Sequence, residues 1–145
     1  SLFRLFRKGN INQHFAVIGT ARSNWSDEHF REVVADSIQS LNPTKEDLDK
    51  FVSHFYYQTH NVDNTEEYHL LGQLANQLDQ KYELNGNRLF YLAMAPRFFG
   101  TISKHIKSQN IMTENGFNRL IIAKPFGMYE PGDLRFSAVR LCALL

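Results

Sequence analysis

Short apolar runs alternate along the chain with longer segments whose apolar residues recur at helical spacing. The runs predict strands at about residues 15–19, 55–60, 87–94 and 119–123. Between them, a helix is predicted after Ser26, with an apolar side made of Phe30, Val33, Val34 and Ile38. Further helices are predicted from Thr44 and over residues 64–82 and 97–110. Strands that alternate with helices favour right-handed crossovers and a parallel sheet.

The start of the chain refines this fold class. "SLFRLFRKG" has the pattern of a helix that stops at Gly9. A dinucleotide-binding fold normally begins with a strand and a glycine-rich turn that lead into its first helix. We therefore predict an α/β, Rossmann-like parallel sheet with flanking helices, in which these 145 residues lack the first strand and the glycine-rich turn.

Ligands of such sheets bind beyond the carboxyl ends of the strands. The residues at those positions are Thr20–Ala21–Arg22, His60–Asn61–Val62, Ala95–Pro96 and Lys124–Pro125. Arg22 is informative because an arginine after the second strand of a dinucleotide fold accommodates the 2′-phosphate of NADP, whereas an acid there binds the ribose of NAD. No acid follows this strand before Asp27. The alternative interpretation is that Arg22 is a solvated loop cation.

The stretch "LIIAKPFG" ends a buried strand on a lysine and a proline. Lys124 would offer three donors and a positive charge to an anionic, hydroxylated ligand, and Pro125 would fix the turn that aims it. The alternative is a lysine that merely extends from a strand end into water.

Composition narrows the classes of protein. The chain is 43% hydrophobic and 13% aromatic, which favours a packed core over disorder. A net charge of +1 predicts no attraction to nucleic acid or an anionic membrane, and no apolar run approaches a membrane span. The single cysteine, Cys142, suits a reducing, cytoplasmic compartment. The six histidines show no metal-ligand spacing.

Several stretches together resemble a known family. "HFAVIGTAR", "FREVVADSI", "GNRLFYLAMAPRFFGTISKHIKS" and "GFNRLIIAKPFG" are similar to glucose-6-phosphate dehydrogenase of the bacterial type, from Ser1 to about Gly127. The resemblance implies a partial coenzyme-binding domain over residues 1–127 and a divergent, apolar tail over residues 128–145. It also implies NADP as cofactor, a sugar phosphate as substrate, and an intact enzyme that is commonly a homo-oligomer.

The resemblance implies roles for individual residues. Arg22 and Ser23 would hold the 2′-phosphate of NADP, and Asn61 and Val62 would lie near the adenine. Ala95 and Pro96 would line the cofactor with backbone. Lys124 would reach both cofactor and substrate, and Pro125 would form a cis hinge. The family commonly has acids where this chain has Asn61 and Ala123, so the contacts made by those carboxylates are not expected here.

The function implied is NADP-dependent oxidation of glucose 6-phosphate at C1. The alternative is a non-catalytic remnant that binds a nucleotide or another subunit. The family's proton-abstracting histidine motif lies beyond the stretch that resembles it, so we expect the isolated chain to be inactive. Turnover would point to His60, at a strand end, as the base.

Overall fold

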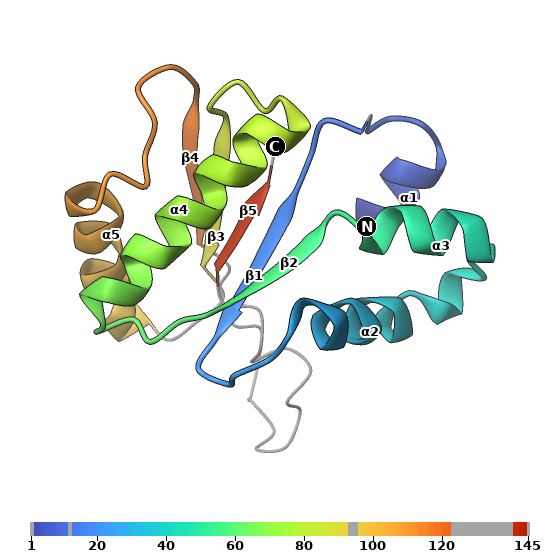
Figure 1. Ribbon diagram of the computed structural model, residues 1–145, viewed down its shortest axis with the longest axis horizontal. Coiled ribbons are helices and arrows are strands. Elements are labelled where there is room, and N and C mark those ends of the chain that lie inside the picture. Colours follow the sequence, from blue (N-terminus) through green and yellow to red (C-terminus); the bar gives the residue numbers. More distant parts are fainter. Residues whose placement is uncertain (1, 12, 93–95, 123–140, 145) are drawn as a thin grey trace.

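The computed structural model describes residues 2–11, 13–92, 96–122 and 141–144. Figure 1 shows helices flanking a set of strands, and the predicted α/β class is confirmed. In chain order the elements are α1 (Leu2–Arg7), β1 (Val17–Ala21), α2 (Asp27–Ser37), η1 (Gln39–Leu41), α3 (Lys45–Val52), β2 (Phe55–Thr59), α4 (Thr65–Tyr82), β3 (Arg88–Leu92), η2 (Pro96–Phe98), α5 (Phe99–Ser108), β4 (Asn118–Ile122) and β5 (Leu141–Leu144).

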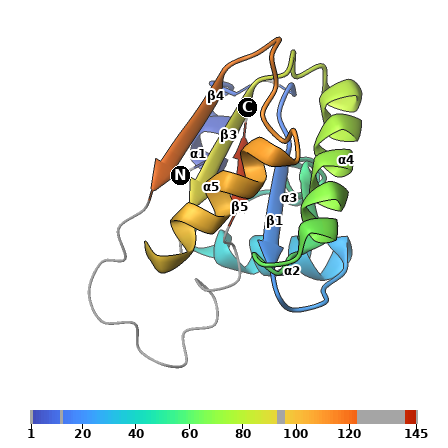
Figure 2. The same cartoon turned by 90° about the vertical axis from the view of Figure 1, so that its left-hand side faces the viewer.

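The predicted parallel pairing is confirmed in both halves of the molecule. β1 pairs with β2 in parallel, and β3 pairs with β4 in parallel. α4 connects β2 to β3, and α5 connects β3 to β4, as crossover helices must between parallel strands. β1, β3 and β4 point the same way in Figure 2. Their carboxyl ends therefore lie along one edge, where ligands of such folds bind.

One strand departs from the all-parallel expectation. β5 belongs to residues 128–145, for which we predicted only an apolar tail, and it pairs antiparallel with β3. It also packs against β1, so that it lies between β1 and β3 (Figure 1). That is the place of the first strand in the doubly wound strand order. The pattern missed β5 because alternation of strands and helices predicts only parallel crossovers.

The bounds of β1 also differ from the prediction. The strand begins two residues later than expected and continues to Ala21, so Arg22 is the first residue beyond it. All five residues are buried, because helices cover both faces of the strand. Gly19 therefore does not end the strand. It makes room for Phe30 of α2, whose ring occupies the place of a side chain at this position.

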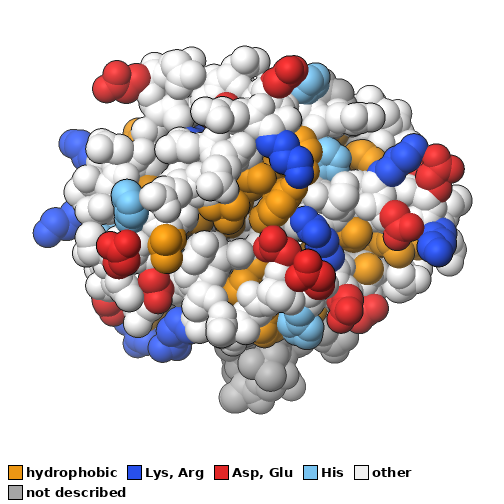
Figure 3. All heavy atoms as spheres, viewed as in Figure 1, with side chains coloured by type: hydrophobic (Ala, Val, Ile, Leu, Met, Phe, Trp, Pro, Cys, Tyr) orange, Lys and Arg blue, Asp and Glu red, His pale blue; other side chains and the backbone are white. Residues whose placement is uncertain are grey.

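Alternate residues of β1 belong to two hydrophobic clusters. Ile18 joins the cluster formed with α4 and α5, which includes Tyr68, Phe90 and Ile102. Val17 and Ala21 join the other cluster, formed with α1, α2 and α3. This period of two is what a strand covered on both faces requires. In the view of Figure 3, hydrophobic side chains are visible in the middle of the face, with charged side chains around them.

The helix starts agree with the capping signals in the sequence. The side chain of Ser26 accepts a hydrogen bond from the amide of His29 at the start of α2, and that of Thr44 accepts one from Asp47 at the start of α3. The side-chain oxygen of Asn64 caps α4 by accepting hydrogen bonds from the amides of Glu66 and Glu67. Among the described helices, none has the length and apolar character needed to cross a bilayer.

The outer edge of β2 is occupied by side chains of α2. The carboxylate of Asp27 accepts a hydrogen bond of 2.7 Å from the amide of Tyr57. The guanidinium of Arg31 donates one of 2.8 Å to the carbonyl of Phe55. Backbone groups that would otherwise meet water at this edge are thus paired within the chain.

Candidate functional site

The predicted site residues that follow β1 and β2 lie at neighbouring strand ends. The last residues of the two strands, Ala21 and Thr59, are register partners. The amide of His60 continues the pairing by donating a hydrogen bond of 2.8 Å to the carbonyl of Ala21. The loops that begin with Arg22 and Asn61 therefore leave the sheet side by side.

Arg22 presents an unengaged guanidinium at this edge. Its side chain is exposed, and within the part of the chain that the structure describes it has no hydrogen-bond or ion-pair partner. Ser23 is also exposed, while its carbonyl oxygen accepts hydrogen bonds from the hydroxyls of Tyr57 and Thr59. A planar, permanently charged group held on a tethered loop can bind a phosphate bidentately.

Asn61 and Val62 lie beside this loop but are used structurally. The side-chain oxygen of Asn61 accepts a hydrogen bond from the backbone amide of Asp63. The backbone amide of Asn61 donates to the carboxylate of Glu67. Val62 is 8% exposed, and its carbonyl accepts a hydrogen bond of 2.9 Å from the hydroxyl of Tyr68. Val62 therefore offers little surface to a ligand.

The other predicted site residues are only partly covered by the structure. Pro96 begins η2, four positions after the end of β3. Ala95, Lys124 and Pro125 lie outside the described residues. β4 ends at Ile122, so Lys124 follows that strand closely in the sequence.

A supporting layer behind Arg22 was missed by the sequence reasoning. Tyr57 and Thr59 of β2 hydrogen-bond to the loop after β1, and Asp27 fixes the backbone of Tyr57. The only sequence signal is that Tyr57 and Thr59, two positions apart in "FYYQT", both carry hydroxyls. Their target becomes visible only when β1 and β2 are paired in register.

His60 is a buried histidine rather than a surface one. It is 3% exposed, and its ring lies edge-on to Tyr68 with 4.3 Å between the ring centroids. Burial lowers the pKa of His60 to about 4, with nearby His105 acting in the same direction and Glu67 opposing it. Its Nε2 atom and the hydroxyl of buried Thr20 have no hydrogen-bond partner among the described residues. A neutral ring enclosed in this way is poorly placed to act as a base on a substrate in solvent.

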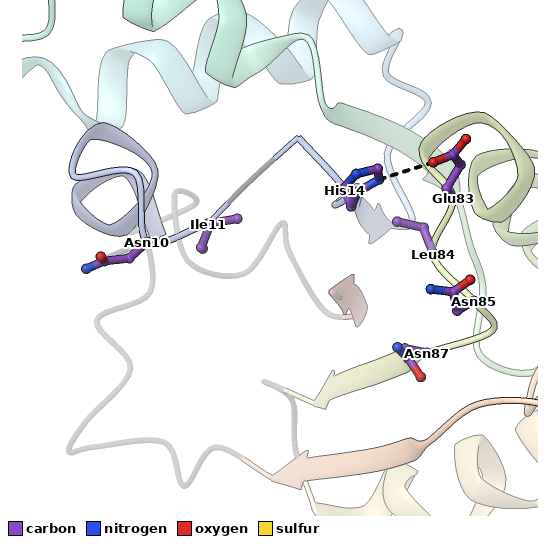
Figure 4. A pocket seen from close by; sticks show the side chains of 7 residues that line it. All are labelled: Asn10, Ile11, His14, Glu83, Leu84, Asn85 and Asn87. Atoms are coloured by element: carbon purple, nitrogen blue, oxygen red, sulfur yellow. Dashed lines mark ion pairs between the residues drawn. The ribbon is translucent and has the colours of Figure 1, made fainter.

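A hollow of about 290 Å³ lies at the opposite edge, where the strands begin. Its lining comes from the segment before β1 and the turn before β3 (Figure 4): Asn10, Ile11, His14, Glu83, Leu84, Asn85 and Asn87. The side chains of His14 and Glu83 point toward one another there and are both largely exposed. Nδ1 of His14 lies 3.8 Å from Oε2 of Glu83. Since Arg22 lies at the other ends of the strands, this hollow is separate from the candidate site.

Comparison with known proteins assigns the chain to a family. Residues 1–134 match the family described as glucose-6-phosphate dehydrogenase, NAD binding domain. The chain is 55% identical over 127 residues to glucose-6-phosphate 1-dehydrogenase of Streptococcus pneumoniae, 46% to that of Bacillus subtilis and 41% to that of Leuconostoc mesenteroides. Each alignment covers 88% of this chain and 26% of the relative.

A solved structure supports the same assignment. Glucose-6-phosphate dehydrogenase in complex with its substrate glucose-6-phosphate matches the fold with a TM-score of 0.75 at 34% identity, over 87% of this chain and 26% of that one. The 145 residues thus span about a quarter of the length of the relatives they match. The sequence and the fold both match, and the chain belongs to the family of glucose-6-phosphate dehydrogenase NAD-binding domains.

Proposed function

We propose that the chain is the coenzyme-binding part of an NADP-dependent glucose-6-phosphate dehydrogenase, which oxidises glucose 6-phosphate at C1. The observation that carries this proposal is the guanidinium of Arg22, which is exposed at the carboxyl end of β1 and has no partner among the described residues. The names of the relatives support the substrate and the reaction. When bound, NADP would supply the nicotinamide that accepts the hydride.

The residues around Arg22 fit a 2′-phosphate. The first acid after Arg22 in the sequence is Asp27, at the start of α2. Its carboxylate accepts a hydrogen bond from the amide of Tyr57 and is thus engaged within the chain. Arg22 and Ser23 would bind the phosphate, and the loop of Asn61 and Val62 would border the adenosine. Ala95 and Pro96 would contact the coenzyme through backbone. Lys124 would donate to the sugar phosphate, and Pro125 would act as the hinge.

A comparison of two nucleotides tests the role of Arg22. The 145-residue chain is titrated with 2′,5′-ADP and with 5′-AMP, followed by backbone amide NMR shifts. We expect the chain to prefer 2′,5′-ADP, and Arg22→Ala to reduce that preference about ten-fold or more, because a charge-assisted phosphate contact is lost. Lys45→Ala removes an exposed cation from α3 and should leave the preference unchanged. Equal affinity for both nucleotides, unaltered by Arg22→Ala, would exclude Arg22 from the site.

An activity assay separates binding from catalysis. Oxidation at C1 also needs a base for the hydroxyl proton, and none of the six histidines stands in the family's arginine–x–aspartate–histidine–tyrosine motif. We expect the purified 145-residue chain to form no NADPH from glucose 6-phosphate and NADP. Turnover that Lys124→Ala abolishes would show that the chain carries its own base.

A further inference from the structure

The loop that carries Arg22 is fixed by hydroxyl groups of the neighbouring strand. The hydroxyl of Tyr57 lies 3.1 Å from the carbonyl oxygen of Ala21 and 2.5 Å from that of Ser23. These two carbonyls belong to the residues immediately before and after Arg22. One side chain of β2 therefore reaches the backbone on both sides of the arginine.

Tyr57 itself is held rigidly. It is 7% exposed, and its ring packs against Trp25 and Phe30 with centroid distances of 5.5 and 5.7 Å. Its amide is bonded to the carboxylate of Asp27. A buried ring with fixed backbone loses little further freedom when its hydroxyl donates, so the contact to the loop is preorganised.

A second hydroxyl supports the same loop. That of Thr59 lies 3.4 Å from the carbonyl oxygen of Ser23 and 3.2 Å from the side-chain oxygen of Asn24. Thr59 pairs in register with Ala21, the last residue before Arg22. Tyr57 and Thr59 lie two positions apart, so both side chains leave β2 on the same face.

We propose that Tyr57 is a positioning residue for recognition of the 2′-phosphate, acting through the backbone on either side of Arg22. The inference rests on the proposed function, in which Arg22 binds that phosphate. Tyr57 does not touch the phosphate. It restricts the directions in which the guanidinium can point, so that binding the phosphate costs less conformational entropy. Thr59 contributes in the same way through its weaker contact.

The substitution Tyr57→Phe tests this role, because it removes the hydroxyl and keeps the ring. We expect the affinity of the 145-residue chain for 2′,5′-ADP to fall about five-fold, because a loop without this contact loses more conformational freedom when the phosphate binds, and that for 5′-AMP to stay the same. Thr59→Val should shift the ratio in the same direction by a smaller factor. Tyr56→Phe is the matched control: its hydroxyl contacts Tyr82 and Lys81, away from the loop, and its loss should not change the ratio.

A double variant separates positioning from general destabilisation. If Tyr57 acts through Arg22, Tyr57→Phe should have no effect on the nucleotide ratio in an Arg22→Ala background. A fall in affinity for both nucleotides, or one that persists in that background, would mean a structural role and overturn the inference. An unchanged ratio of the two nucleotide affinities in Tyr57→Phe would also overturn the inference. If Arg22→Ala still lost the preference for 2′,5′-ADP in that case, the proposed function would stand. If Arg22→Ala has no effect either, the proposed function itself fails.

Discussion

The rings of His60 and Tyr68 meet edge to face, with planes 87° apart, where the end of β2 packs against α4. The ring of Tyr68 also stacks on the ring of His105 in α5, with an angle of 8° between the ring planes and 4.5 Å between the centroids. Tyr68 is fully buried. A strand end and two helices are thus joined through three aromatic rings.

The first prediction concerns pH. The pKa of His60 is lowered to about 4 in the folded protein, against an ordinary value of 6.5. Between these values the unfolded chain binds a proton that the folded chain excludes, so stability falls as pH falls through this window. From about pH 7 to about pH 5, His60 should account for a loss of roughly 2 kcal/mol in the free energy of unfolding.

Urea unfolding of the chain and of His60→Gln at both pH values checks this. The variant should lose less stability on acidification than the parent chain, whatever its stability at neutral pH. His69→Gln changes an exposed histidine of α4 and should keep the full loss. An identical loss in the parent and in His60→Gln would rule out His60 as the source.

The second prediction compares two glycines. A methyl group at Gly19 would clash with the ring of Phe30, which is buried against β1, whereas one at Gly100 in α5 would meet nothing within 4 Å. Gly19→Ala should destabilise the chain by about 1–3 kcal/mol through overpacking. Gly100→Ala should be neutral or stabilise it by up to about 1 kcal/mol through helix propensity. Thermal unfolding of both variants measures the difference, and equal midpoints would contradict this account of the β1–α2 contact.

The third prediction concerns the buried cation Arg88, which is 4% exposed. Its guanidinium donates to the carbonyl of Ile111 at 2.6 Å and to the side chain of Asn76 at 2.7 Å. Arg88→Met leaves the buried carbonyl of Ile111 without its donor and also removes the bond to Asn76, so it should cost about 3 kcal/mol in urea unfolding. Arg119→Met removes an exposed arginine from neighbouring β4 and should change stability by less than about 0.5 kcal/mol. A similar loss of unfolding free energy in the two variants would contradict the structural role given to Arg88.

The fourth prediction uses the end of α4. Glu83 ends this helix in a left-handed conformation, with φ of 56°, which glycine adopts without strain. Glu83→Gly should therefore stabilise the chain by about 0.5–1 kcal/mol, and the exposed contact with His14 that it removes contributes little. Gln80→Gly, in the last helical turn, should instead cost about 1 kcal/mol. Chemical denaturation of both variants tests the opposite signs.

The sequence predicted those parts of the fold that depend on local pattern. The apolar runs gave the parallel pairs β1–β2 and β3–β4, and side-chain caps such as Ser26 gave helix starts. Features created by packing between distant segments were out of reach. His60 follows a predicted strand, at a position where ligands bind, yet its ring is buried beside Tyr68. The contact between Tyr57 and the Arg22 loop depends on the register between β1 and β2, which the sequence pattern does not predict.

The bonds from α2 to the outer edge of β2 have a consequence for behaviour at high concentration. An unpaired strand edge is a template on which another molecule can add a strand, and such additions lead to aggregates. Here Asp27 occupies the amide of Tyr57 and Arg31 the carbonyl of Phe55. An incoming strand would have to displace both charged groups before it gained its own hydrogen bonds. Along this edge the chain is thereby protected against self-templated assembly, by two side chains that also hold α2 in place.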